Sequence, residues 1–412
     1  MDQNPLLTRL KSLKQWQGGK GYTIDSIRLA AENLGDPQEG FRTIHVTGTN
    51  GKGSTAAMIA AGLGSAGFKV GLFTSPHLST MNERFCIDGT PLSDAQLEAV
   101  LESIVEKIGE SFFDLSFFEA CTIVGFQSFW MEQVDFGVIE VGLGGTLDAT
   151  NVIKCPELAV ITSISLDHEN VLGNTEEAIA RDKCGIIKPG TSVFVGQVRR
   201  EIRDLIEAEA QKRQARNVSF FSPKDLFSSQ LRGEYQALNS GLARSCLRGL
   251  GVSEPAIERG FASVVWPGRM EEVRGFSRPI TFECAHNIDG IRKSCRALGS
   301  VLESEPTIAF GVLETKQWRE MLGELLELSR DFLLLEPDSS RSLPQNELQS
   351  WLTGNGVSFR AFGRDYSRFI TDEIEGSDSS KPLVLIGSIY LVGAIRGLLG
   401  LPFGPLWQRE HV

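Results

Sequence analysis

One recurring unit constrains the fold of this chain most: a short apolar run, a turn of Gly, Ser or Asn, and then a helical stretch. In the first part of the sequence the runs lie at residues 43–47, 70–74, 138–141 and 158–162. Continuous rather than alternating apolar runs predict strands that are covered on both faces, as in a parallel sheet between helices. Because such sheets bind ligands beyond the carboxyl ends of their strands, we expect the chemistry to lie in the turns.

The same unit starts again late in the chain, with runs at residues 279–283, 307–311, 332–335 and 383–387. Between the two sets, Trp266-Pro267-Gly268 interrupts the pattern, as Pro and Gly do at boundaries. The sequence therefore predicts two α/β domains, 1–268 and 269–412.

Composition excludes several classes of protein. The chain has 412 residues, of which 41% are hydrophobic and 23% charged, so it is not mainly disordered. Its net charge of −11 argues against a whole-surface nucleic-acid binder. The longest uncharged apolar stretch, 382–395, is too short to cross a membrane. Seven scattered cysteines without a C-x-x-C pair, and no apolar secretory segment in residues 1–18, predict a cytoplasmic protein.

The first strand runs into a glycine-rich loop that is followed by an alanine-rich helix. Glycines let backbone N–H groups approach phosphate oxygens, and the helix N-terminus adds positive potential. Lys52 supplies a cation, and Ser54 or Thr55 could reach a Mg²⁺ ion. A plain turn capping a helix is the alternative, but strand, lysine, hydroxyl and helix in this order favour nucleotide phosphate binding. The predicted ATP-binding loop comprises Gly48, Thr49, Asn50, Gly51, Lys52, Gly53, Ser54 and Thr55.

Three polar residues end or follow other predicted strands. Glu140 ends an apolar strand, where an unpaired buried carboxylate would cost several kcal/mol. Ser75 and His168 follow strands 70–74 and 158–162, so all three are expected on one side of one sheet. Mg²⁺ prefers oxygen ligands, so on physical grounds alone His168 is equally well a hydrogen-bonded loop residue. Lys183 lies near a predicted helix end, and by itself it is best interpreted as a solvated lysine.

A set of segments in fixed order resembles the folylpolyglutamate synthase and dihydrofolate synthase family of the Mur-ligase superfamily. The resemblance covers residues from about 22 to 397. The segments are HVTGTNGKGS at 45–54, TSPHL at 74–78, IEVGLGG at 139–145, LDATN at 147–151, TSISLDH at 162–168, DKCGI at 182–186, PGR at 267–269, AHN at 285–287 and GSIYLVG at 387–393.

The resemblance implies roles for residues that the patterns alone leave open. Ser75, Glu140 and His168 would carry Mg²⁺ beside the triphosphate, and a carbamate on Lys183 would serve a second Mg²⁺. Lys52, His168 and Lys183 would be the catalytic residues. The remaining nucleotide-binding residues that it implies are Asn239, Arg269, Glu283 and His286. Phe118 and Asp148 match the region around the pterin, although phenylalanines 117, 118, 126 and 129 stand at helical spacings that also suit core packing.

The chain departs from the family pattern at several positions. The family usually has D-G-A-H-N-P where this chain has Glu283, Cys284, Ala285, His286, Asn287 and Ile288. Thr146 stands where the family commonly has arginine. Cys284 also lacks the freedom of glycine to adopt positive φ. These changes bear on the identity of the acid substrate more than on the use of ATP.

The resemblance implies an ATP-dependent amide ligase. Its fold would combine an N-terminal P-loop ATPase-like parallel-sheet domain with a smaller Rossmann-like C-terminal domain, and its active site would lie in the cleft between them. L-glutamate would be joined to dihydropteroate, to reduced folates or to both, through an acyl phosphate. We expect a monomer that binds small molecules and neither nucleic acid nor membrane. The alternatives are a Mur-type ligase for a non-folate acid and a catalytically inactive nucleotide-binding regulator.

Overall fold

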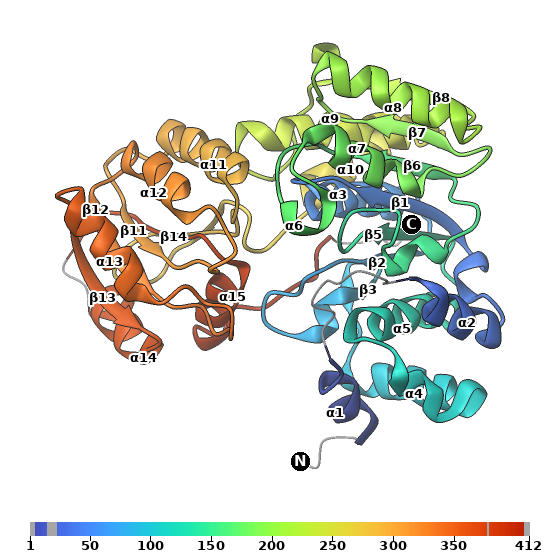
Figure 1. The fold of residues 1–412 in the computed structure, drawn as a ribbon, viewed down its shortest axis with the longest axis horizontal. Coiled ribbons are helices and arrows are strands. Elements are labelled where there is room, and N and C mark those ends of the chain that lie inside the picture. Colours follow the sequence, from blue (N-terminus) through green and yellow to red (C-terminus); the bar gives the residue numbers. More distant parts are fainter. Residues whose placement is uncertain (1–4, 15–22, 377–378, 408–412) are drawn as a thin grey trace.

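The computed structural model describes residues 5–14, 23–376 and 379–407 and contains two sheets, each flanked by helices (Figure 1). We call the part from α1 to α10, with the first sheet, the first body, and the part from β9 to α15 the second body. Residues 1–4 and 15–18, on which the absence of a secretory segment partly rests, lie outside the described residues. Within the described ranges no helix is long and apolar enough to cross a membrane.

The first sheet has eight strands in the order β4-β3-β2-β5-β1-β6-β7-β8. The six strands β2, β5, β1, β6, β7 and β8 pair in parallel. Strand β3 pairs antiparallel with both β2 and β4. Every residue of β2, β5, β6 and β7 is buried, which explains their mainly apolar sequences, interrupted only by Glu140 at the end of β5 and Ser192 at the start of β7. The strands are β1 (Arg42–Thr47), β2 (Val70–Phe73), β3 (Phe85–Ile87), β4 (Thr90–Pro91), β5 (Phe136–Glu140), β6 (Leu158–Ile161), β7 (Ser192–Val195) and β8 (Asn217–Phe220).

The second sheet has six strands in the order β13-β12-β11-β14-β10-β9, all parallel except β9. Both sheets therefore confirm the predicted α/β class. The strands are β9 (Glu271–Val273), β10 (Ile280–Glu283), β11 (Thr307–Phe310), β12 (Asp331–Leu335), β13 (Ser358–Gly363) and β14 (Leu383–Ile386).

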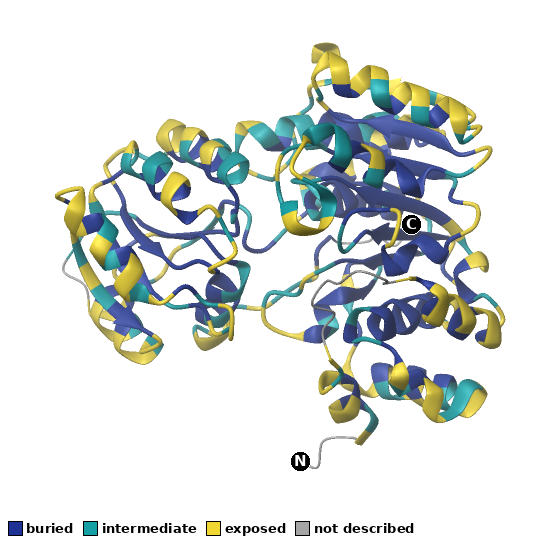
Figure 2. Cartoon of the chain, viewed as in Figure 1, coloured by how far each residue is buried: buried dark blue, intermediate teal, exposed yellow. Residues whose placement is uncertain are grey.

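Helices pack on both faces of each sheet, with buried sides toward the strands and exposed sides outward (Figure 2). In the first body α4 and α5 begin with capping boxes, in which Ser93 pairs with Gln96 and Ser116 with Glu119. The helices are α1 (Pro5–Lys11), α2 (Asp25–Leu34), α3 (Lys52–Ser65), α4 (Asp94–Ile108), α5 (Phe117–Met131), α6 (Glu169–Leu172), α7 (Glu176–Lys183), α8 (Arg200–Lys212), α9 (Glu234–Gly249), α10 (Glu254–Ser263), α11 (Ile288–Val301), α12 (Trp318–Leu326), α13 (Gln345–Gly354), α14 (Tyr366–Phe369) and α15 (Ile389–Leu398).

The chain passes between the two bodies twice. It leaves the first body after α10 and enters the second sheet at Glu271. After α15 it returns, and Leu406 and Trp407 are buried in the core cluster that contains α3 and α10. The Leu406 backbone accepts from Val265 N at 2.7 Å and donates to Gly89 O at 2.7 Å. The predicted division at residue 268 stays a prediction, but these tail residues pack with the first body.

Candidate active site

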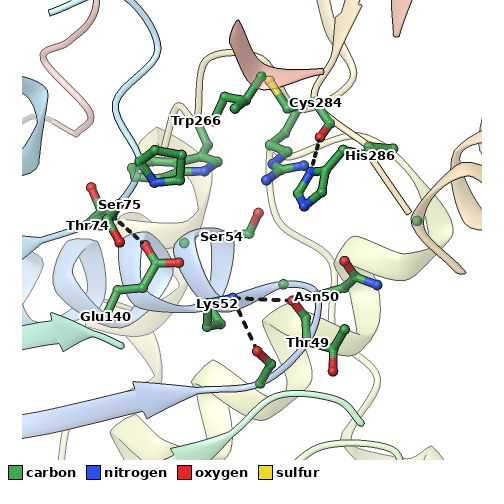
Figure 3. Close-up of a pocket in the computed structure, with 18 of the residues that line it drawn as sticks. Thr49, Asn50, Lys52, Ser54, Thr74, Ser75, Glu140, Trp266, Cys284 and His286 are labelled. Atoms are coloured by element: carbon green, nitrogen blue, oxygen red, sulfur yellow. Dashed lines mark hydrogen bonds between the residues drawn. The ribbon is translucent and has the colours of Figure 1, made fainter. Parts of the chain in front are cut away.

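A cleft of about 180 Å³ lies where the carboxyl ends of the first sheet's strands face the second body. Its lining combines the glycine-rich loop after β1, the turns after β2, β5 and β6, the segment between α10 and β9, and the end of β10. Figure 3 shows side chains from both bodies directed toward this space. Most of the predicted site residues therefore meet in one place.

The glycine-rich loop between β1 and α3 has a shape that depends on its glycines. Gly48 has φ 147° and Gly51 φ 85°, a region that other residues rarely adopt. A Cβ on Gly48 would lie 1.9 Å from Thr162 Oγ1. The hydroxyl of Thr162 in turn donates to Asn50 O at 2.7 Å, and Thr49 N donates to Ser163 O at 2.8 Å. The end of β6 thus holds the loop against the sheet.

Lys52 is the first residue of α3, and its ammonium is held over the loop. Lys52 Nζ donates to Gly48 O at 3.2 Å and to Thr49 O at 3.3 Å (Figure 3). Of the two candidate hydroxyls, Ser54 lines the cleft. Thr55 is fully buried and is not among the residues that line the cleft, so its contact with a nucleotide stays a prediction. One step along a helix turns a side chain by about 100°, which directs Thr55 into the core.

Ser75, Glu140 and His168 all line the cleft, and of these three Ser75 and Glu140 are hydrogen-bonded to each other. Ser75 N donates to Glu140 Oε2 at 3.2 Å, beside Lys52 (Figure 3). Burial raises the pKa of Glu140, and the charge of Lys52 opposes that shift. His168 has φ 52° and a half-exposed side chain. Withdrawal from water, with a contribution from Lys316, lowers the pKa of His168 to about 4, so its imidazole is neutral at pH 7.

Among the described residues no group of three His, Cys, Asp or Glu side chains is placed to hold a metal ion. Any ion here would therefore take a mixed set, the Glu140 carboxylate together with hydroxyl, imidazole and phosphate groups. The buried Glu140 carboxylate fits that role, because the hydrogen bond from Ser75 N engages one of its oxygens, Oε2. A hard cation, which prefers oxygen ligands, would bind the other oxygen of the Glu140 carboxylate.

Lys183 ends α7, as predicted, and is buried beneath the loop. Its Nζ donates to Gly48 O at 3.0 Å. Burial, and then the charge of Lys52, lower the pKa of Lys183 to about 7. A large share of this amine is therefore neutral at physiological pH, and a neutral amine is the form that can react with CO₂.

The other predicted nucleotide-binding residues come from α9 of the first body and from the segment and strand end that enter the second body. Asn239 on α9 faces the loop, since a Cβ on Gly51 would lie 2.5 Å from Asn239 Oδ1. Arg269 follows the interruption at 266–268, and its Nη1 lies 3.5 Å from Glu283 Oε1. His286 Nδ1 is 2.9 Å from Cys284 O, and burial, with the nearby Lys316, lowers the pKa of His286 to about 3.

The departures from the family pattern are accommodated without strain. Cys284 is not among the residues with positive φ, so the freedom of a glycine is not used there. Ile288 begins α11 after Asn287, whose Oδ1 caps the helix by accepting from Gly290 N at 2.8 Å. Thr146 donates its hydroxyl to Asp182 O at 2.9 Å, next to Lys183.

The two residues predicted near the pterin do not line this cleft. Asp148 begins a short 3₁₀ turn, and its carboxylate accepts from Thr150 N at 3.0 Å, from Thr150 Oγ1 at 2.5 Å and from Leu143 N at 2.8 Å. The ring of Phe118 packs against the Gly142 backbone and the core cluster around α5. Both residues shape the loop after β5, and their contact with a substrate stays a prediction.

Sequence reasoning missed a polar cluster that joins the two bodies. Asp167 accepts from Lys316 Nζ at 2.7 Å and from Asn287 Nδ2 at 2.9 Å. Asn50 Nδ2 donates to Asn287 Oδ1 at 3.2 Å and to Asp289 Oδ2 at 2.8 Å. Burial would raise the pKa of Asp167, but Lys316 and the two neighbouring histidines hold it below its ordinary value. Asp167 and Asn287 stand inside conspicuous motifs, whereas nothing in the sequence marks Lys316.

Comparisons with known proteins match nearly the whole chain. Residues 46–243 match the Mur ligase middle domain. The dihydrofolate synthase/folylpolyglutamate synthase of Bacillus subtilis is 31% identical over 411 residues, which cover 90% of this chain and 94% of that protein. The Mycobacterium tuberculosis folylpolyglutamate synthase complexed with ADP and AMPPCP has a TM-score of 0.83 at 28% identity, over 93% of this chain and 96% of that one. For Escherichia coli FolC in complex with DHPP and ADP the TM-score is 0.83 at 26% identity, over 96% and 98%.

Proposed function

The chain belongs to the folylpolyglutamate synthase and dihydrofolate synthase family, and on that premise we propose that it joins L-glutamate to dihydropteroate, to reduced folates, or to both. The reaction consumes ATP. An oxygen of the acid's carboxylate attacks the γ-phosphorus, ADP leaves, and an acyl phosphate forms. The amine of glutamate then attacks the carbonyl carbon, phosphate leaves, and the amine gives up a proton.

The glycine-rich loop is the observation that carries this proposal. Its shape leaves the Lys52 ammonium and the N-terminus of α3 facing the cleft. A triphosphate seated there would meet backbone N–H donors and one cation, which offset the charge that spreads over a transferring phosphoryl group. Asn239 on α9 and Arg269 line the same cleft, and they would contact the rest of the nucleotide.

Magnesium is the metal that this donor set suits. Glu140, Ser75 and His168 would hold it beside the phosphates, and Lys183 as a carbamate would serve a second ion. A bound Mg²⁺ would neutralise phosphate charge. The lowered pKa of Lys183 supports the modification, because only the neutral amine adds CO₂. Carbamylation would also turn a buried cation next to Lys52 into an anion, which removes a repulsion between like charges.

The second body completes the site by covering it. Asp167, Lys316 and Asn287 bring the two bodies together at the mouth of the cleft. Closure of this kind keeps water from an acyl phosphate, which water would otherwise hydrolyse. We assign to this body the binding of glutamate. We further propose that the protein acts as a monomer in the cytoplasm, where its seven free thiols would stay reduced.

The test is phosphate release and product mass with ATP and glutamate, run side by side with dihydropteroate, with tetrahydrofolate and with no acid. We expect a glutamylated product from at least one of the two acids and none without acid. Turnover only with an unrelated acid would point to another Mur-type ligase. ATP binding without turnover on any acid would identify an inactive regulator.

A further inference from the structure

Glu283, where the chain departs from the aspartate of its family, has a carboxylate with every oxygen engaged. Its side chain is only 2% exposed. Oε2 accepts from Tyr235 Oη at 2.8 Å and from Met270 N at 3.0 Å, while Arg269 Nη1 lies 3.5 Å from Oε1. The buried carboxylate therefore has its donors within the protein and needs none from a ligand.

Electrostatics also argue against Glu283 as a direct ligand of the phosphates. A carboxylate that faced a triphosphate would repel it, and the repulsion would be strong in a site shielded from water. The Arg269 guanidinium can satisfy both the buried Glu283 carboxylate and a bound phosphate. It can pair with Glu283 on one side and, from its position in the cleft lining, contact a phosphate on the other.

Tyr235 connects this pair to the first body. It lies in the first turn of α9, four residues before Asn239, so the two side chains lie on one face of the helix. Asn239 lies against Gly51 of the phosphate loop. Burial, and then the charge of Glu283, raise the pKa of Tyr235, so its hydroxyl stays protonated and donates. A single helix face thus contacts both the loop and the carboxylate that holds Arg269.

The length of the side chain decides whether this contact forms. Aspartate is one methylene shorter, which would withdraw the carboxylate by roughly 1.5 Å, the length of a C–C bond. A hydrogen bond of 2.8 Å to Tyr235 would then be lost unless the backbone moved. The glutamate and the tyrosine therefore work as a matched pair.

We propose that Glu283 and Tyr235 are positioning residues, which together hold Arg269 at a set distance from the phosphate loop when the two bodies meet. Arg269, rather than Glu283, contacts the phosphates. This inference rests on the proposed function in one respect: it takes ATP as the ligand of the glycine-rich loop.

The experiment measures the affinity of the non-hydrolysable analogue AMPPCP, with Mg²⁺, by calorimetry on the full chain without acid or glutamate. The variants are Tyr235→Phe, Arg269→Ala and the double variant. Tyr366→Phe is the matched control, because that hydroxyl donates to Glu336 O at 2.5 Å within the second body and does not line the cleft. We expect Tyr235→Phe to weaken binding about tenfold, as for loss of a hydrogen bond to a charged group, and Tyr366→Phe to leave it unchanged.

The double variant decides how Tyr235 acts. If it acts through Arg269, Tyr235→Phe causes no further loss once Arg269 is alanine. An equal tenfold loss in that background, or an equal loss in Tyr366→Phe, would overturn the inference. Glu283→Asp is an independent test that also serves if Tyr235→Phe fails to fold. It should reproduce the tenfold loss, and full affinity in Glu283→Asp would contradict the matched pair. Because no turnover is measured, a protein that binds AMPPCP but glutamylates no folate would refute the proposed function alone.

Discussion

The two walls of the cleft are built in different ways. The first wall consists of turns that directly follow parallel strands of one sheet, and backbone bonds such as Thr49 N to Ser163 O at 2.8 Å hold them. The second wall comes from a connecting segment and the end of one strand of another sheet. Its position relative to the first depends on side-chain contacts between the bodies, among them Asn50 with Asn287 and Asp167 with Lys316.

Because of this difference, the first wall governs the reaction itself, and the second wall governs how the two bodies assemble around it. We expect most residues of the first wall to keep their geometry when the bodies separate, since the strands before them are buried on both faces. Residues of the second wall reach their places only when the bodies meet. We therefore expect changes in the first wall to abolish the reaction, and changes in the second to weaken binding or closure by degrees.

The largest effect is expected for Lys52→Ala. Loss of the Lys52 ammonium, which donates to the loop carbonyls of Gly48 and Thr49, should lower kcat by about a thousandfold, the scale for removing a group that stabilises transition-state charge. The measurement is the rate of glutamylated product, with circular dichroism to confirm an intact fold. Lys212→Ala, at the exposed end of α8, is the control and should retain full activity. Full-rate product from Lys52→Ala would refute the assigned site.

Gly48→Ala tests whether the shape of the loop matters as much as its charge. The new Cβ would lie 1.9 Å from Thr162 Oγ1, so the loop must move, and nucleotide affinity should fall by about a hundredfold. Gly67→Ala has a similarly unfavourable φ of 94° but meets nothing within 4 Å. It should cost about 1 kcal/mol of stability and no affinity. Equal affinity losses in the two variants, measured by calorimetry, would show that backbone strain alone is responsible.

The pH profile tests Lys183. Below its pKa of about 7 the amine is mostly protonated and cannot add CO₂, so activity should fall as pH falls through about 7. Added bicarbonate should raise activity on that side of the profile, and native mass spectrometry should show the mass of one added CO₂. If bicarbonate left the pH profile of activity unchanged, and no added mass of CO₂ appeared at any pH, the carbamate would be excluded.

The smallest effect on turnover is expected for Lys316→Ala in the second wall. This removes the cation that binds the buried Asp167 at 2.7 Å, a charged hydrogen bond of about 2 kcal/mol. The nucleotide-free protein should open, which small-angle scattering would record as a larger radius of gyration. Activity should fall less than about tenfold, because bound ATP favours the closed form. Arg319→Ala, whose exposed pair with Glu347 lies within the second body, should change neither quantity.

The strands that sequence reasoning predicted and those that it missed differ in burial. The runs at 158–162 and 383–387 correspond to β6 and β14, whose residues are all buried, so their sequences are apolar throughout. The missed strands β8 and β13 lie at sheet edges, where exposed and less exposed residues alternate and no apolar run marks them. β7 is fully buried but begins with Ser192, and its run was overlooked.

The site divides in the same way. The loop residues, with Ser75, Glu140, His168 and Lys183, could be found because each follows a strand or ends a helix within a recognisable motif. Their contact partners were harder to predict: Tyr235 with Glu283 and Asp167 with Lys316 are 48 and 149 residues apart along the chain. Asp148 shows the converse, since its motif was evident but its carboxylate caps its own loop.

By itself, the sequence determined the α/β class, the glycine-rich loop and the strand ends around it, because backbone conformation and two-sided burial are local properties that residue order records. Only the tertiary structure decided which polar groups of the second body meet that loop, and that the tail returns to the first body. Those contacts depend on how two separately folded sheets dock, and docking is set by shape and charge across the whole interface rather than by any one segment.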